Sequence, residues 1–266
     1  MRKLKPVRLI GILIFGAAMN SSLSGQIHFG ISPIRAEHTG KPGESFTEIF
    51  QIRNNATHPI RIKVYTENWT MKDDGVPEFI GAVPTSYSCR DWIKVNPQDF
   101  RLMPEEVKTV RYTVGIPADI APAGYHASVS FETVPDAGSP RTSSGVVFTG
   151  KIAAVVYVKV GRVSIEGDVI DMKFGQKAGS PAIVLVLKNP GKTHFRTKGR
   201  VEIFDAADKR IADLEVPDEV VLPEKTREVA CLLSKILEPG EYRALCRLDI
   251  GRPEILEMEK ALKVEK

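Results

Sequence analysis

An arginine closes the first alternating segment of the chain, FGISPIRAEH at residues 29–38. Successive side chains of a strand point to opposite faces, so the odd-numbered residues of this segment share one face: Phe29, Ile31, Pro33 and Arg35. Three of them are apolar, yet the series ends in a permanent cation whose planar guanidinium can bind a carboxylate through two parallel hydrogen bonds. Two interpretations stay open: a carboxylate-binding arginine in a cleft, or an arginine in water where the strand leaves the core.

No other set of side chains has the spacing of a catalytic or metal site. A nucleophile elbow, a phosphate-binding loop and a dinucleotide fingerprint are missing from the sequence. The histidines are scattered without metal-ligand spacing, and His126 and His194 are expected to be solvated at outward or turn positions. The acidic residues gather in turns, and nothing singles out a pair for glycoside hydrolysis. The sequence therefore predicts no enzyme, no metal site and no cofactor.

The elements around Arg35 have the pattern of β-strands. Short runs with a period of two, separated by Pro, Gly, Asn and Asp, are typical of an all-β sandwich. In PIRIKVYTENW, residues 60, 62 and 64 are apolar and the intervening ones are polar. In GYHASVSFET, residues 125, 127, 129 and 131 are expected to face the core, and residues 126, 128 and 130 to face outward.

The chain contains two copies of one plan. Three landmarks recur in the same order: an Asn that begins a turn (54 and 189), a Pro-Glu turn (104–105 and 223–224), and a Tyr that opens a strand after Pro and Gly (125 and 242). The tyrosines fit the tyrosine corner of immunoglobulin-like sandwiches, and an Asn side chain suits a turn because it can cap its own backbone. The first copy carries about 16 extra residues, roughly 70–91. We therefore expect two tandem immunoglobulin-like domains, at 26–160 and 162–266, with a boundary near Gly161.

The N-terminus has the layout of a secretory signal peptide. MRKLKPVR is cationic, LIGILIFGAAM is apolar and too short for a membrane span, and NSSLSGQ offers small residues for cleavage. Removal of residues 1–24 takes away four cations and lowers the formal charge from +4 to about 0. The mature chain then has no excess charge for nucleic acid, and it is expected to be exported, without a membrane span.

Three cysteines, at 89, 231 and 246, are an odd number for an exported chain and match no zinc pattern. Cys231 and Cys246 are expected to face one core from neighbouring strands. The sequence leaves open whether they form a disulfide or stay free thiols.

The last strand of the first domain is a candidate for binding another protein. SGVVFTGKIAAVVYVKV, residues 144–160, is long and follows a polar loop. Val146 and Phe148 share one parity with the later apolar residues, and Lys151 lies on the other. An exposed strand edge can pair with an extended segment of a partner; the alternative is a buried last strand of an ordinary sandwich.

These residues resemble the periplasmic pilus-assembly chaperones, the PapD-like family, most clearly in the first domain. ISPIRAEHTGKPGESFTEIFQIRNN resembles that family's opening, DFRLMPEEVKTVRYTV its Pro turn and following strand, and GKIAAVVYVKV its long edge strand. The resemblance implies that Arg35 grips the C-terminal carboxylate of a secreted β-rich subunit, that Lys151 is the second cation, and that Val146 and Phe148 are donated to the subunit. The family's Ile-Lys order is reversed here and its Arg-Pro is missing, and a shift of two places puts Ala153 at the second position.

Two functions follow from this sequence. The first is a periplasmic chaperone that caps secreted pilus or surface-structure subunits. The second is a structural or adhesive envelope protein of two immunoglobulin-like modules, since the first domain is also similar to extracellular envelope proteins of that kind. An exposed edge at 144–150 favours the chaperone, whereas an edge covered by the 70–91 insertion favours the envelope module.

Overall fold

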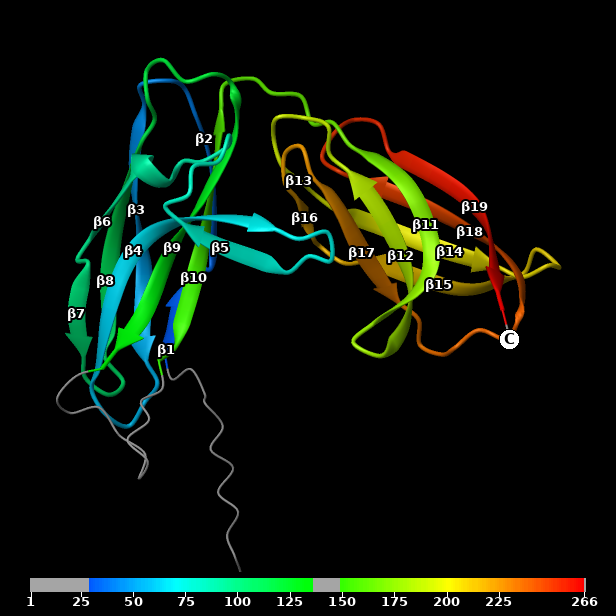
Figure 1. The fold of residues 1–266 in the computed structure, drawn as a ribbon, viewed down its shortest axis with the longest axis horizontal. Coiled ribbons are helices and arrows are strands. Elements are labelled where there is room, and N and C mark those ends of the chain that lie inside the picture. The colour runs from blue at the N-terminus through cyan, green and yellow to red at the C-terminus, as the bar shows by residue number, and fades with distance from the viewer. Residues whose placement is uncertain (1–28, 136–148, 266) are drawn as a thin grey trace, which may run out of the picture.

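The computed structural model describes residues 29–135 and 149–265, and in these residues the chain is nearly all β-strand (Figure 1). The helical content of the described part is one 3-10 turn, η1 (Arg90–Trp92). The expected signal peptide at 1–24 lies outside the described residues, as do Val146 and Phe148.

Two sheets form the first sandwich. The first sheet has the order β1 (Phe29–Ser32), β3 (Ser45–Asn54), β8 (Val107–Gly115) and β6 (Ile93–Asn96). The second has the order β2 (Arg35–Gly40), β10 (Lys151–Val160), β9 (Ala123–Val134), β4 (Ile60–Met71) and β5 (Pro77–Gly81), and β7 (Asp99–Leu102) also pairs with β4. Two facing sheets with these neighbours and these connections form an immunoglobulin-like sandwich.

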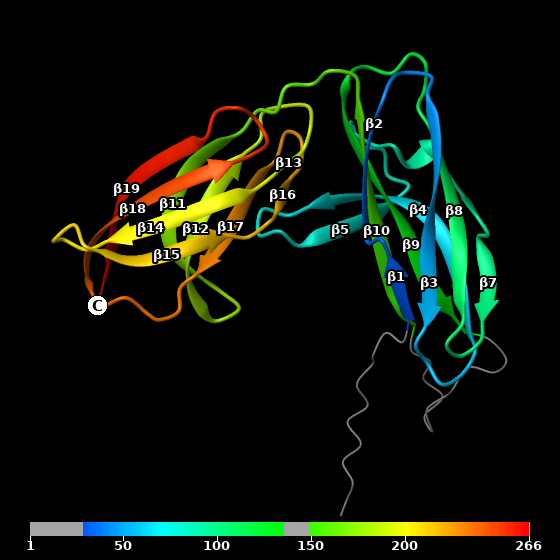
Figure 2. The ribbon, with the colours of Figure 1, turned by 180° about the vertical axis from the view of Figure 1, so that it is seen from behind.

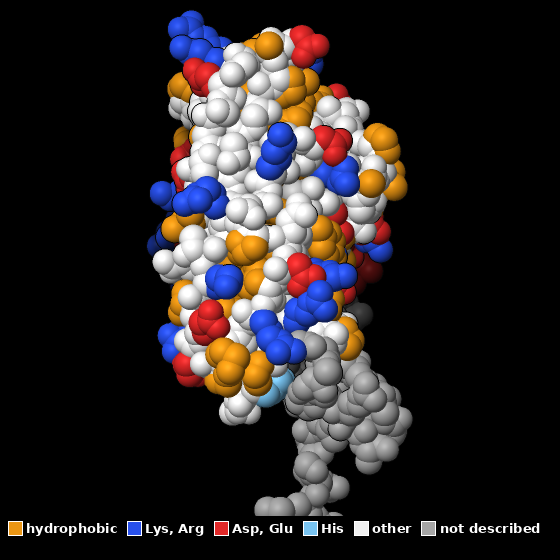
Figure 3. Space-filling view, turned by 90° about the vertical axis from the view of Figure 1, so that its left-hand side faces the viewer, with side chains coloured by type: hydrophobic (Ala, Val, Ile, Leu, Met, Phe, Trp, Pro, Cys, Tyr) orange, Lys and Arg blue, Asp and Glu red, His pale blue; other side chains and the backbone are white. Residues whose placement is uncertain are grey.

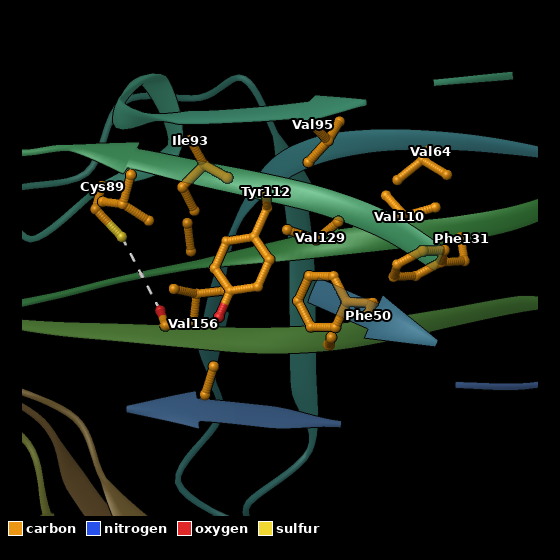
Figure 4. Close-up of a cluster of buried hydrophobic side chains, with 14 of the residues drawn as sticks. Phe50, Val64, Cys89, Ile93, Val95, Val110, Tyr112, Val129, Phe131 and Val156 are labelled. Carbon is orange, nitrogen blue, oxygen red and sulfur yellow. Dashed lines mark hydrogen bonds between the residues drawn. The ribbon is translucent and has the colours of Figure 1, made fainter. Parts of the chain in front are cut away.

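The core of the first sandwich consists of the side chains that point inward from alternate positions of both sheets. Figure 4 shows Tyr112 and Phe50 at its centre, where their rings stack with centroids 4.5 Å apart. Phe131 of the opposite sheet meets Phe50 edge-on at 5.5 Å. All three are almost fully buried, and aromatic pairs in such geometries add to the burial of apolar area. The alternation in the sequence correctly predicted Phe131 and its inward partners on β9.

The second sandwich follows the same plan. One sheet has the order β11 (Asp168–Lys177), β12 (Ser180–Lys188) and β17 (Thr226–Leu232), and the other has β15 (Arg210–Val216), β14 (Lys198–Phe204), β18 (Gly240–Asp249) and β19 (Leu256–Val264). A short ribbon pairs β13 (Phe195–Arg196) with β16 (Val220–Val221). Its core shares no residue with the first. The prediction of an all-β chain with two immunoglobulin-like sandwiches is confirmed.

Asn54 and Asn189 make the same contacts in their two domains. Each side-chain oxygen accepts the backbone N–H two residues on, from Ala56 at 2.8 Å and from Gly191 at 2.9 Å. Each side-chain amide donates to the carbonyl four residues on and to a carbonyl before the Pro-Glu turn, that of Leu102 or Val221. Both asparagines are buried, so each is the centre of its turn, as the repeat predicted.

The two tyrosines also behave as the repeat predicted. The hydroxyl of Tyr125 donates to the carbonyl of Ala121 at 2.8 Å, and that of Tyr242 donates to Glu238 at 2.7 Å. Each bond ties the start of β9 or β18 back to the crossover that precedes it, which is the role of a tyrosine corner.

The first strand of the chain changes sheets at Pro33, and this change sets the environment of β10. β1 pairs with β3, whereas β2 pairs with β10 in parallel, with Arg35 opposite Val155. Proline has no backbone N–H and cannot continue a ladder. β10 is therefore covered by β2 over Val155–Val160, and only Lys151–Ala154 lack a β2 partner. The long edge strand expected at 144–160 is thus, in its described part, open over only four residues.

Candidate functional site

Arg35 lies at the beginning of β2, on the face of the sheet turned away from the core. Its side chain is 44% exposed. Its Nε is 3.3 Å from Glu37 Oε1, and its Nη1 donates to Asp218 Oδ2 at 3.5 Å. Asp218 belongs to the second domain, so Arg35 lies between the domains and not in a simple strand end facing water.

Arg196 approaches the same carboxylate from the second domain. Its Nε donates to Asp218 Oδ1 at 2.6 Å and its Nη2 to the carbonyl oxygen of Asp218 at 3.0 Å. These contacts, with Arg35, hold the pKa of Asp218 below its usual range. Nothing in the sequence singles out Asp218 or Arg196, because both lie in the second domain, in segments of no distinctive pattern.

Lys151 lies on the same sheet face as Arg35, but it forms an ion pair with a different carboxylate, that of Glu67. Its Nζ donates to Glu67 Oε1 at 2.6 Å and lies 4.4 Å from the centre of the Phe79 ring. The Glu67 side chain is only 8% exposed and also accepts a hydrogen bond from Ser130. Lys151 is four residues from the partner of Arg35 along β10, about 13 Å. Ala153 lies between these positions on the same face and brings no cation.

The outward face of β9 is covered, contrary to expectation. His126, Ser128 and Ser130 point away from the core as predicted, yet all three are buried. His126 meets the Trp69 ring edge-on at 5.3 Å, and burial lowers its pKa to about 4. His194 of the second domain packs on Tyr157 at 4.1 Å, and burial lowers its pKa to about 3. The prediction of solvated histidines is wrong because His126 is enclosed by Trp69 and the 87–89 segment of its own domain, and His194 packs across the domain boundary.

The 70–91 insertion forms the cover. β4 and β5 make a hairpin that reaches across to the second domain, as both ribbon views show (Figures 1 and 2). The N–H of Glu228 in β17 donates to the carbonyl oxygen of Asp73 at its tip, at 2.6 Å. Beneath it, Trp69 and Tyr157 pack with Val220 and Leu222 in a third apolar cluster. In the strand order β5 lies at the opposite end of the sheet from β2, so the insertion does not pair with the open edge of β10, although its Phe79 ring contacts the Lys151 side chain across the sheet face.

The cysteines are free thiols, and all three are buried. Cys231 lies on β17 and Cys246 on β18, in the two facing sheets of the second sandwich. They face one core as predicted, but from opposite sheets and not from neighbouring strands. Burial raises the pKa of each to about 12, and it raises the pKa of Cys89 as well.

Other kinds of site find little support in the described residues. Residues 29–135 and 149–265 contain no group of three or more His, Cys, Asp or Glu placed to hold a metal ion. The same ranges contain no helix long and apolar enough to cross a membrane. Figure 3 shows the face of the first domain turned away from the second, where cationic, anionic and apolar side chains are interspersed.

No protein-family model matches the chain, and no curated protein matches it. Solved structures similar to it include the class 5 fimbriae chaperone CfaA, at 17% identity and a TM-score of 0.47 over 90% of this chain and 100% of that one. Another is the YadV chaperone, at 8% identity and a TM-score of 0.48 over 89% of this chain and 100% of that one. A third comes from the CsuC–CsuE chaperone–tip adhesion subunit pre-assembly complex of the archaic chaperone-usher Csu pili of Acinetobacter baumannii. Its identity to this chain is 12%, and the TM-score is 0.47 over 89% of this chain and 99% of that one. Each of the three is a structure of a chaperone or of a chaperone complex, and the similarity concerns the fold alone.

Proposed function

We propose that this chain is a periplasmic, non-catalytic chaperone that binds secreted β-rich subunits of pili or surface structures. It binds a subunit by pairing an extended segment with the open part of β10 and by gripping the segment's C-terminal carboxylate with Arg35. The proposal rests above all on one observation: the open part of β10 ends where Arg35 begins.

The hydrogen-bonding direction of β10 supports strand addition. The N–H of Val155 donates to the carbonyl of Ile34, on the β2 side. Backbone groups of a strand repeat their direction every two residues, so the N–H groups of Ala153 and Lys151 point to the same, open side. These two N–H groups continue the row of donors that bond β2, so an incoming strand can accept hydrogen bonds from them. Main-chain bonds of this kind supply the affinity of β-strand addition.

The strand direction fixes which end of the segment meets Arg35. β2 runs parallel to β10 and starts at Arg35, opposite Val155. A strand placed beside Lys151–Ala154 and parallel to β10 therefore ends at Arg35 with its carboxyl terminus. A strand in the opposite direction presents its amino terminus to the guanidinium, which repels it. Val146 and Phe148 come before this stretch, and their insertion into the subunit is part of the proposal.

The envelope-module alternative depends on an edge covered by the 70–91 insertion. The insertion instead packs on the sheet face and on β17, which favours the chaperone. The role of Lys151 as second cation stays a prediction, and its ammonium already has Glu67 as a partner.

Substitution of Ala153 by proline tests strand addition directly. Proline removes the N–H that points to the open side but leaves the β9 ladder, which uses the N–H groups of Ile152 and Ala154. Tagged wild type, Ala153→Pro, Ala153→Val and Arg35→Ala are purified from the periplasm, and bound proteins are identified by mass spectrometry. We expect Ala153→Pro and Arg35→Ala to lose subunits that wild type and Ala153→Val retain. The circular dichroism spectra of all four proteins should be the same, which shows that they are equally folded. Equal partners for all four, or none for wild type, would favour the envelope module.

A further inference from the structure

The Asp218 carboxylate lies between two guanidinium groups, one from each domain. Arg35 Nη1 meets Oδ2 at 3.5 Å, and Arg196 Nε meets Oδ1 at 2.6 Å. Each arginine thus engages a different oxygen of one carboxylate. This is the arrangement that a carboxylate from another molecule needs when it is gripped by two cations.

Arg196 is held in place independently of that carboxylate. Its Nη2 donates to the backbone carbonyl of Asp218 at 3.0 Å, a bond that does not involve the Asp218 side chain. Arg196 lies on β13, which pairs with β16 through Val220. It also lines a cavity of about 530 Å³ between the domains, together with Tyr157 and His194. The second guanidinium is therefore in position before any ligand arrives.

Asp218 is held by one short contact, 2.6 Å to Arg196 Nε, and is otherwise open to replacement from the water side. Its side chain is 61% exposed and that of Arg35 is 44% exposed, and ion pairs with this much water contribute little. The 3.5 Å contact to Arg35 is also longer than the 2.7–2.9 Å typical of strong charge-assisted bonds. Lys151 differs, because its partner Glu67 is buried and bound at 2.6 Å. Displacing Glu67 would leave a buried carboxylate without its cation.

We propose that Arg35 and Arg196 form one carboxylate-binding site across the two domains, which Asp218 fills until the C-terminal carboxylate of a bound segment replaces it. This inference rests on the proposed function and deepens it, since it names Arg196 as the second cation and Asp218 as an internal competitor. The incoming carboxylate takes over contacts to both arginines, and the Asp218 side chain moves into water.

Two fluorescein-labelled decapeptides of alternating valine and threonine test the site. One ends in a free carboxylate and the other in an amide, and fluorescence anisotropy gives the affinity of each for the purified chain. We expect wild type to prefer the acid. Asp218→Asn should bind the acid up to about fivefold more tightly, the most that an exposed ion pair contributes, and the amide unchanged. Arg196→Gln should lose the preference, and Arg196→Lys should recover part of it.

The control variants are Arg200→Gln and Asp213→Asn, which break another exposed ion pair of the second domain, 2.7 Å between Nε and Oδ1. They should bind both peptides as wild type does. If Arg35→Gln loses the preference while Arg196→Gln and Asp218→Asn behave like wild type, the two-arginine site is overturned and the proposed function stands. Equal binding of acid and amide by wild type overturns the carboxylate grip and this site together. Binding of neither peptide overturns the strand-addition function on which both rest.

Discussion

Glu228 in β17 donates its backbone N–H to the carbonyl oxygen of Asp73, so the tip of the β4–β5 hairpin is bonded to a strand of the other domain. The hairpin is thus an inter-domain brace, and its Gly75 packs against the Arg227 side chain. A Cβ at Gly75 would lie 2.7 Å from Arg227 Nη2. The brace fixes how the two sandwiches face each other, and with them Arg35 and Asp218.

Gly75→Val should release the brace. We expect a wider distribution of inter-domain distances in small-angle X-ray scattering and two separate unfolding transitions in calorimetry. Gly81→Val is the matched control, because Gly81 has φ +61° and Gly75 has φ +87°, yet a Cβ at Gly81 meets nothing within 4 Å. Both variants carry backbone strain, and only Gly75→Val clashes. Identical scattering for the two would mean that the hairpin does not hold the domains.

Lys151→Met should destabilise the first domain. It leaves the buried Glu67 carboxylate without its cation, and the loss of a hydrogen bond to a charged group costs about 2 kcal/mol of unfolding free energy. Lys72→Met, at the exposed Lys72–Glu78 pair, should change it by no more than about 0.5 kcal/mol. The double variant Glu67→Gln with Lys151→Met should recover part of the loss in urea denaturation. Equal effects at Lys72 and Lys151 would contradict the special role of the buried acid.

Asn54→Ala and Asn189→Ala should each destabilise their own domain by about 2–4 kcal/mol, because each removes several buried hydrogen bonds at one turn. Asn55→Ala, at the neighbouring exposed position, serves as the control and should change little. Urea denaturation followed by hydrogen exchange assigns each loss to a domain. A small effect at Asn189 alongside a large one at Asn54 would show that the two turns are not equivalent in energy.

Stability should fall as the pH is lowered from 6.5 towards 4. The pKa of His126 is about 4 and that of His194 about 3 in the folded chain, against about 6.5 when unfolded. The unfolded chain therefore binds more protons over this range, so the free energy of unfolding decreases as pH decreases. The stabilisation is complete above pH 6.5. His126→Gln and His194→Gln should each reduce the dependence of the unfolding free energy on pH in this range, measured by urea titrations; an unchanged slope in both would place these rings in water.

The thiols should be inert in the native chain. Burial and pKa values of about 12 keep Cys231 and Cys246 protonated, and thiols react as thiolates. We expect slow labelling by Ellman's reagent until the chain is unfolded, and the same melting temperature with and without dithiothreitol. A lower melting temperature in dithiothreitol would instead indicate that Cys231 and Cys246 are joined.

Much of the fold could be predicted because its signals are local. The alternation of β4 and β9 follows from the period of a strand, and Tyr125 and part of the Asn54 contacts act within four residues along the chain. The partial covering of β10 was missed, since it depends on where β2 begins after Pro33. Strand pairing between residues 120 positions apart leaves no mark in either segment alone.

The site was predictable only in part. Arg35 stood out because a cation closed an apolar series. Asp218, Arg196 and Glu67 are ordinary charged residues in sequence, and they acquire a role only when two domains or two distant strands meet. The low exposure of His126 and His194 has the same origin, because the rings that cover them, Trp69 and Tyr157, come from distant strands.

The mixed character of the surface that the two domains share has a consequence for the order in which the chain folds. Synthesis delivers the strands of the first sandwich before those of the second. The face that waits for its partner carries Trp69 and Tyr157, which later pack with Val220 and Leu222. Until the second sandwich has been made, these two rings lack their apolar partners. The half-made protein therefore has an apolar patch, open to aggregation, on the side that it later conceals.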